Sequence, residues 1–450
     1  MRYLEMVVSK MVDTHSCSEI KDSGIDWIGY IPKSWSIRTL YQLVTQVKCK
    51  NSGLQEKNLL SLSYGKIKRK DIESPEGLLP ASFDGYNIIE AGDIVLRLTD
   101  LQNDHTSLRV GLATERGIIT SAYTTLRPIN AKHSKYIYYM LHAFDLKKGF
   151  YGMGSGVRQG LNYDEVKELR VVLPSDNEQE AITAYLDDQC EQINSIIEEA
   201  KTSIEEYKAW KASIIYEVVT KGLDPSAKMK DSGIQWIGNI PEKWSICRMK
   251  NCFTQRDGGA WGDDAKNDEG DMICLRIADF DYAKLSFKKD CEYTVRNYTQ
   301  NTIEKLLLQK GDILIEKSGG GEKTPVGRAV IFDCEFPALF ANFMDRLRCA
   351  NNIDSKWMVY VLFAFYSKGC VKNYIKQTTG IQNLNITDML AMEYIALPSI
   401  NEQHNVVTYL DSKCTAINEV ISEKEVLIRD LESYKRSLIY EIVTGKRKVV

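Results

Sequence analysis

The residue types that perform chemistry are present in this chain but not at catalytic or metal-binding spacings. The five histidines, at positions 15, 105, 133, 142 and 404, form no recognisable triad or ligand set. The eleven cysteines contain no C-x-x-C pair and no histidine cluster beside them. The sequence therefore predicts neither a zinc site nor a disulfide framework, but reduced thiols in a cytoplasmic protein.

Two glycine-rich segments invite a nucleotide or methyl-donor interpretation, and both fail it. KSGGGEKTPVGR (Lys317–Arg328) has Glu322, not Gly, before Lys323, and Pro325 prevents the helix that a phosphate loop needs. GMGSG (Gly152–Gly156) follows no convincing strand and begins no Rossmann-like helix. The ten prolines are all isolated, so the Pro-Pro of an amino-methyltransferase loop is missing. We expect a chain that binds and positions, and is not itself an enzyme.

Four phrases occur twice in the same order, which identifies two copies of one plan. The offset between copies rises slowly, from 209 to 224 residues, so insertions are confined to the middle of each copy. The pairs are DSGIDWIGYIPKSW with DSGIQWIGNIPEKW, AGDIVL with KGDILI, VVLPSDNEQ with IALPSINEQ, and SIIYEVVTKG with SLIYEIVTGK.

Each copy begins with a mixed body, at residues 21–174 and 231–398. Short apolar or alternating runs such as GDIVLRL and GDILIEK have strand length and are flanked by turn residues. Helical stretches such as KYIYYMLHAF lie among them. The fold class predicted for both bodies is α+β.

Each copy ends with a long helix, predicted at residues 175–222 and 399–446, and a linker at 223–230 joins the first helix to the second body. Apolar residues recur at alternating spacings of four and three, which is the pattern of a coiled-coil seam. Lys211 interrupts the first seam, and Lys424 and Lys435 interrupt the second. Nine extended residues reach only about 30 Å, too short to run back along such a helix. We therefore expect an antiparallel coiled coil, with pseudo-two-fold symmetry and one body at each end.

The repeated phrase at residues 22–35 and 231–244 contains two glycines, a proline and four apolar anchors in each copy. We interpret it as an extended clip whose tryptophans pin the body to its helix. Contact with a partner protein is the alternative.

Together, the phrase S-G-I-x-W-I-G-x-I-P-x-x-W, the L-P-x-x-x-E-Q helix start and the duplicated body closely resemble the specificity subunits of type I restriction–modification enzymes. The resemblance extends over nearly the whole chain from about residue 20. It implies two target recognition domains that read the two parts of a split, asymmetric sequence in double-stranded DNA. It also implies that the central helices act as a ruler and as a dock for two modification subunits. Residues 1–20 have no counterpart in the second copy and are predicted to be an N-terminal extension.

The same resemblance implies which ligands belong to the partners. Modification subunits would use S-adenosylmethionine, and restriction subunits would use ATP and magnesium, so we expect no cofactor on this chain. A protein-interaction scaffold, with two modules on a coiled coil and no DNA, remains the alternative. The formal net charge of −3 gives no general support for DNA binding, so any basic surface would be local. The longest apolar run, at 357–366, is too short to span a bilayer.

Arg, Lys, Asn and Gln read base edges and hold phosphates, so these types define the candidate DNA contacts. A charge run is usually a solvated face, and a Gly-flanked loop can be a structural turn leading into the scaffold. With those alternatives open, the candidates in the first domain are Lys66, Lys68, Arg69, Lys70, Arg158, Gln159 and Asn162. Those in the second are Lys317, Lys323, Arg328, Gln382, Asn383 and Asn385.

Overall fold

The computed structural model describes residues 19–71, 82–101, 104, 106, 108–153, 160–378 and 380–449. The chain divides into two compact units: unit 1 contains residues up to Glu199 and those from Leu427 onward, and unit 2 is Ala200–Val426. Each unit therefore contains one mixed body, the beginning of the long helix that comes after this body, and the end of the other long helix. Both units combine helices and strands, and the predicted α+β fold is confirmed.

Unit 1 is built on a four-stranded antiparallel sheet in the order β4-β11-β8-β9. Its strands are Val44–Val47 (β4), Thr124–Pro128 (β11), Ile94–Leu96 (β8) and Val110–Leu112 (β9). Four further pairs of described strands are β1 (Ile20–Asp22) with β2 (Tyr30–Pro32), β3 (Ser36–Thr39) with β12 (Arg170–Leu173), β5 (Leu60–Ser63) with β6 (Lys66–Arg69), and β7 (Asn87–Ile89) with β10 (Gly117–Ile119). Helix α2 (Ser134–Leu146) contributes ten buried residues to the core, and α3 (Tyr163–Val166) is a single turn.

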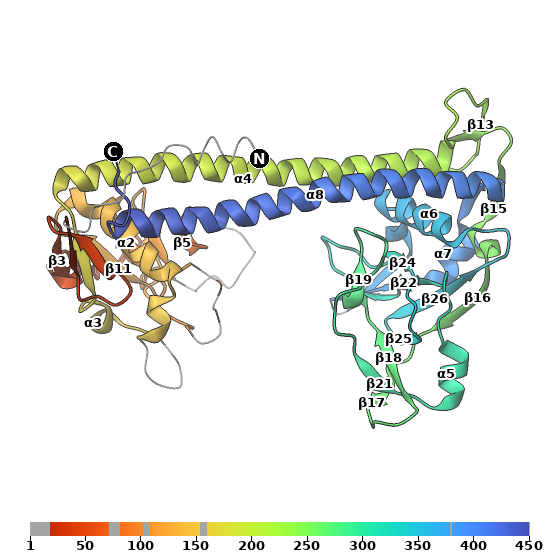
Figure 1. Ribbon diagram of the computed structural model, residues 1–450, viewed down its shortest axis with the longest axis horizontal. Coiled ribbons are helices and arrows are strands. Elements are labelled where there is room, and N and C mark those ends of the chain that lie inside the picture. The colour runs from red at the N-terminus through yellow and green to blue at the C-terminus, as the bar shows by residue number, and fades with distance from the viewer. Residues whose placement is uncertain are drawn as a thin grey trace. The chain divides into compact units, whose positions relative to one another are not determined.

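Unit 2 repeats that sheet in the order β16-β26-β22-β24. Its strands are Phe253–Gly258 (β16), Met344–Cys349 (β26), Ile313–Glu316 (β22) and Ala329–Ile331 (β24). Figure 1 shows α6 (Ser355–Ser367) beside this sheet, in the place that α2 takes in unit 1. The pair β15 (Ser245–Arg248) with β29 (Tyr394–Leu397) matches β3 with β12, and α7 (Ile386–Met392) precedes β29.

Unit 2 also has elements that enlarge its body. A mixed sheet in the order β17-β21-β18-β25 contains one parallel pair, β18 with β25. Its strands are Asp263–Asp264 (β17), Val295–Asn297 (β21), Asp271–Leu275 (β18) and Ala338–Phe340 (β25), and α5 (Gln300–Leu306) comes after β21. A hydrophobic cluster joins this sheet to the first one, since it also contains Leu314 of β22 and Val330 of β24. The remaining strands are the pair β13 (Met229–Asp231) with β14 (Asn239–Pro241), the hairpin β19 (Phe280–Asp281) with β20 (Ser286–Phe287), and the sheet of β23 (Ser318–Gly319), β28 (Ile381–Leu384) and β27 (Ile375–Thr378).

The repeated AGDIVL and KGDILI phrases build the same turn in both bodies. Gly92 and Gly311 both have φ of +93°, a left-handed conformation that strongly favours glycine. The next residues, Asp93 and Asp312, are each 1% exposed. Asp93 accepts from Arg127 at 2.6 and 2.8 Å, and Asp312 accepts twice from Arg348 at 2.7 Å. A buried carboxylate requires such a partner. The repeated phrase therefore corresponds to an ion pair that occurs in both units.

The two long helices are α4 (Asp176–Lys221) and α8 (Ile400–Val443). Both start with a capping box, as the S-x-x-E spacing favours. The backbone amide of Ser175 donates to Glu178 Oε2 at 3.0 Å, and that of Ser399 donates to Glu402 Oε2 at 3.1 Å. Glycines with positive φ come after both helix ends, at 222 and 445. In each unit a part of α4 lies beside a part of α8 (Figure 1).

Candidate nucleic-acid interface

The first clip, residues 22–35, joins the start of α4 to the end of α8 inside unit 1. Its Trp35 is 4% exposed and donates through Nε1 to Glu178 Oε1 at 3.1 Å, in the first turn of α4. The hydroxyl of Tyr440, in the last turn of α8, donates to the carbonyl of Trp27 at 2.9 Å. Since one clip meets the start of one helix and the end of the other, the two helices are antiparallel in this unit.

The second clip, residues 231–244, makes the same two contacts inside unit 2. Trp244 is 2% exposed and donates to Glu402 Oε1 at 3.2 Å, in the first turn of α8. The hydroxyl of Tyr216, near the end of α4, donates to the carbonyl of Trp236 at 2.9 Å. The repeated phrase is therefore a clip that pins each body to the helices, as the sequence predicted. The antiparallel direction is also confirmed in each unit.

Within each unit, the seam between the helices contains apolar residues interrupted by one polar pair. In unit 1, Leu186 and Ile193 of α4 share a core with Leu438 and Ile442 of α8. Lys435 donates to Asn194 Oδ1 at 2.8 Å beside them. In unit 2 the equivalent pair is Lys211 with Asn418 Oδ1, at 3.0 Å. The lysines at 211 and 435 interrupt the seam because each has an amide partner on the facing helix.

The hairpin β5–β6 carries the first candidate DNA contacts. Lys66, Lys68, Arg69 and Lys70 are all exposed. Arg69 donates through Nε to Glu115 Oε1 at 2.8 Å, so its charge is already paired. Within the described residues the three lysines have no ion-pair partner. Lysines that have no internal partner suit phosphate contact, so the structure leaves Lys66, Lys68 and Lys70 available and commits Arg69 to the fold.

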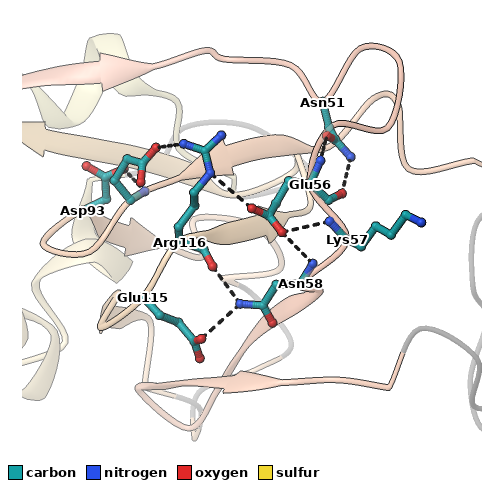
Figure 2. A network of polar contacts seen from close by, with 8 residues as sticks. Asn51, Glu56, Lys57, Asn58, Asp93, Glu115 and Arg116 are labelled. Atoms are coloured by element: carbon teal, nitrogen blue, oxygen red, sulfur yellow. Dashed lines mark hydrogen bonds and ion pairs between the residues drawn. The ribbon is translucent and has the colours of Figure 1, made fainter.

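A polar network joins the segment that precedes β5 to the segment that precedes β10 (Figure 2). Arg116 donates to Glu56 Oε2 at 3.1 Å and pairs with Glu90 at 2.5 Å. Asn58 connects the carbonyl of Arg116 at 2.7 Å to Glu115 Oε2 at 3.1 Å. The backbone amide of Asn58 also keeps the pKa of Glu56 below its usual value. The carboxylates of Glu56, Glu90 and Glu115 are therefore hydrogen-bonded to other groups of unit 1.

The loop Lys317–Arg328 of unit 2 is only partly available to a ligand. Arg328 donates to Glu316 Oε1 at 2.7 Å, and its guanidinium lies 3.7 Å from the ring centroid of Tyr282. Lys317 pairs with Asp345 at 3.0 Å. Lys323 is exposed, and it has no ion-pair partner in the part of the chain that the structure describes. Of the three candidates, Lys323 is the one whose charge is not used within the unit.

The amide candidates are mostly engaged in local structure. Asn162 caps α3, accepting from the amide of Asp164 at 2.8 Å, and Asn385 caps α7, accepting from that of Asp388 at 3.1 Å. Gln382 is 7% exposed and accepts from the amide of Val326 at 3.1 Å. Asn383 is exposed and accepts from Ser318 at 2.6 Å. Arg158 and Gln159 lie outside the described residues. Contact with DNA remains a prediction for all of these residues.

Two exposed aromatic residues, Tyr64 and Trp261, were not among the DNA contacts predicted from the sequence. Tyr64 is 75% exposed at the turn of the β5–β6 hairpin, where Tyr64 and Gly65 both have positive φ. Trp261 is 41% exposed, and the guanidinium of Arg296 lies 4.8 Å from its ring centroid. Exposed rings beside cations are suited to stacking on bases or sugars. In the sequence, Tyr64 stands in a Y-G pair between two alternating strands. Trp261 stands in the Gly-rich segment GGAWGDD.

Burial shifts the pKa values of titratable groups in both units. Burial lowers the pKa of His142 to about 4 and raises that of Asp145 to about 6. Burial also lowers the pKa of Lys211. Within the described residues no group of three His, Cys, Asp or Glu side chains could hold a metal ion. No helix in that part of the chain is long and apolar enough to cross a membrane.

Comparison with known proteins gives a family for the chain. The sequence profile of the type I restriction modification DNA specificity domain matches residues 78–206 and 241–426. The chain is also similar to the type I restriction enzyme MjaX specificity subunit of Methanocaldococcus jannaschii. The two are 23% identical over 439 residues, which cover 94% of this chain and 96% of the relative.

Two solved structures resemble the chain, and the first of them shares its fold. One, described as the structural basis of complex assembly and conformational transition of the type I R-M system, has 13% sequence identity and a TM-score of 0.63. That comparison covers 92% of this chain and 99% of the other. The HsdS subunit from Thermoanaerobacter tengcongensis also has 13% identity, with a TM-score of 0.44 over 92% of this chain and 98% of its own.

Proposed function

The chain belongs to the type I restriction–modification DNA specificity family, and we propose that it recognises a split, asymmetric target in double-stranded DNA. One unit reads one half of the target, and the other unit reads the other half. The bases between the halves are not read. Two reading bodies that contact one face of a duplex meet it at positions separated by whole helical repeats of about 10 base pairs, or 34 Å.

The observation that carries this proposal is the division of each unit into a repeated and a divergent part. The clips, the capping boxes and the buried Asp–Arg pairs recur with nearly the same distances. The parts with candidate DNA contacts do not: unit 1 has a basic hairpin, whereas unit 2 has an additional mixed sheet and a Gly-rich loop. A repeated frame with different inserts is expected when the frame has one task and each insert selects its own bases.

We also propose the family's division of labour for this chain. The helices would dock two modification subunits, and restriction subunits would join the complex. Those partners would bind S-adenosylmethionine for adenine methylation, and ATP with magnesium for translocation and cleavage. This chain would supply the sequence selection and no catalytic group.

Exchange of a reading body tests the proposal directly. Residues 38–170 are replaced by the counterpart from another family member, and the methylated motif of the reconstituted complex is determined by methylation-sensitive sequencing. We expect one half of the motif to change and the other half to stay the same. A change in both halves, or in neither, would contradict the modular assignment.

A salt titration separates DNA recognition from the protein-scaffold alternative. Binding to phosphates releases counterions, so the affinity of the assembled complex for a duplex containing its motif should fall steeply as salt rises. The modification subunits alone are the control. A complex whose DNA affinity equals that of the control at every salt concentration would favour the scaffold.

A further inference from the structure

A hairpin of the second body is attached to the helices at the polar break in their seam. The turn between β19 and β20 places the carbonyl of Ala283 against both helices of unit 2. Lys211 Nζ of α4 donates to this carbonyl at 2.5 Å, and Asn418 Nδ2 of α8 donates to it at 2.8 Å. Lys211 also donates to Asn418 Oδ1, so the three groups form a closed triangle.

Burying the lysine of this triangle costs more free energy than burying an apolar residue would. The triangle is therefore expected to do more than stabilise the contact between the two helices. Lys211 is 6% exposed at a position where the seam is otherwise apolar. Burying an ammonium group costs free energy that hydrogen bonds only partly offset, and well-packed apolar residues often serve stability better. What the polar pair adds is a fixed attachment point for the hairpin.

The hairpin connects this attachment to the candidate DNA loop. Tyr282, beside Ala283, donates through its hydroxyl to Glu316 Oε1 at 2.5 Å. Glu316 accepts from the backbone amide of Arg328 at 3.1 Å and from its guanidinium at 2.7 Å. The Lys317–Arg328 loop starts directly after Glu316 and ends at Arg328. Hydrogen bonds, together with the covalent links from Ala283 to Tyr282 and from Glu316 to Lys317, therefore connect the helices to both ends of the loop.

The matching position in unit 1 is arranged differently. The equivalent pair, Lys435 with Asn194, lines a cavity of about 510 Å³ together with Tyr64 and Gly65 from the turn of the β5–β6 hairpin. The cavity beside the Lys211–Asn418 pair is smaller, at about 310 Å³. The two pairs share a position in the repeat, but the hairpins that approach them differ.

We propose that Lys211 and Asn418 are positioning residues that fix the β19–β20 turn on the helices, and that this attachment directs the Lys317–Arg328 loop toward its bases. The proposal rests on the proposed function, because it assigns to the attachment the accuracy with which unit 2 reads its half of the target. Neither residue touches DNA; both act through Ala283, Tyr282 and Glu316.

The test replaces the polar pair by apolar residues that suit the seam. Lys211→Met with Asn418→Leu is compared with the matched pair Lys435→Met with Asn194→Leu, each in the reconstituted complex. Ala283 is exposed, so its released carbonyl can bind water. The helices should stay paired, because the new residues are apolar like the rest of the seam. Methylation of a duplex library, randomised at one half-target at a time, measures discrimination at each half separately.

We expect the Lys211/Asn418 variant to lose at least tenfold in discrimination at the unit 2 half-target and to keep that at the other half. The Lys435/Asn194 variant should keep discrimination at the unit 2 half-target, and so should Lys211→Arg, which retains the donors. Hydrogen exchange should show faster exchange of the Ala283 and Lys284 amides in the first variant only. Should that variant fail to assemble, Asn418→Ala, which removes one donor to Ala283, takes its place.

Two outcomes would overturn the inference, and they differ from a failure of the proposed function. Released Ala283 and Lys284 amides with unchanged discrimination would show that the attachment does not direct reading. Unchanged amide exchange would show that the triangle does not hold the turn. A wild-type complex with no discrimination at either half-target would instead contradict the proposed function, and the exchange data would still decide whether the attachment exists.

Discussion

The two units hold their helices with matching contacts and differ in what extends from them. The Trp Nε1–Glu Oε1 distance is 3.1 Å in unit 1 and 3.2 Å in unit 2, and the Tyr hydroxyl to Trp carbonyl distance is 2.9 Å in both. The bodies then diverge: unit 2 has a second sheet, and its β19–β20 turn is hydrogen-bonded to the helix seam. The contacts that recur define the scaffold, and those that differ mark the residues to test for specificity.

The largest expected effect comes from removing an indole of a clip. Trp35→Ala and Trp244→Ala each leave a large cavity and remove one hydrogen bond to a Glu carboxylate, and we expect each to lower the free energy of unfolding by about 3–5 kcal/mol. Urea denaturation of the purified chain measures this. Trp35→Phe keeps most of the ring and loses the bond to Glu178, so it should cost less. Unequal losses for the two alanine variants would show that the repeated contacts are not equivalent.

The buried aspartates provide the next comparison. Asp312 pairs with Arg348 and also lies 3.8 Å from Arg346, whereas Asp93 pairs with Arg127. Because Asp312 faces two guanidinium groups, Asp312→Asn should lower the free energy of unfolding by about 3 kcal/mol or more. Asp93→Asn should lower it by less. Thermal unfolding monitored by circular dichroism gives the order. A larger loss for Asp93→Asn would contradict it.

Acid sensitivity should distinguish unit 1 from unit 2. His142 of α2 corresponds to Phe363 of α6, and burial lowers its pKa from 6.5 to about 4. Between these pH values the unfolded chain binds a proton that the folded chain does not, so stability falls as the pH falls from about 6.5 to 4. At pH 5 the loss is about 2 kcal/mol.

His142→Phe is the variant that tests this expectation. Asp145 acts in the opposite direction, because burial raises its pKa to about 6. Since Asp145 is present in both proteins, the difference between their free energies of unfolding reports on the histidine alone. We expect that difference to change by about 2 kcal/mol between pH 7.5 and pH 5 in urea denaturation. Parallel pH profiles for the two proteins would show that His142 does not titrate in this range.

The smallest expected effects are those of single exposed lysines. Lys68→Ala and Lys323→Ala should leave the unfolding curve unchanged, because neither side chain has an ion-pair partner among the described residues. If each lysine contacts a phosphate, each change should reduce the slope of log affinity against log salt by about one. Arg69→Ala is the comparison, since its guanidinium is paired with Glu115. An equal slope change for Arg69→Ala would show that the ion pair opens on DNA.

The scaffold was predictable from the sequence because its signals are local. The L-P-x-x-x-E-Q motif indicated the helix starts, and the alternating apolar spacing indicated the buried faces of α4 and α8. The clips could be recognised because an unusual phrase occurs twice. Several candidate DNA contacts were less predictable: Asn162 and Asn385 cap short helices, Gln382 is buried, and Arg328 pairs with Glu316. Residue type alone does not distinguish a side chain that reads a base from one that satisfies its own backbone.

The sequence by itself determined that the chain is duplicated, that each copy ends in a long helix and that the fold is α+β, because repeats, caps and periodicity are properties of neighbouring residues. Only the tertiary structure decided which helix ends each clip joins, why lysines interrupt the seams and which cations are already paired. Those outcomes depend on groups that are far apart in the chain, such as Lys211 with Asn418, and on which of the competing partners folding brings within hydrogen-bond distance.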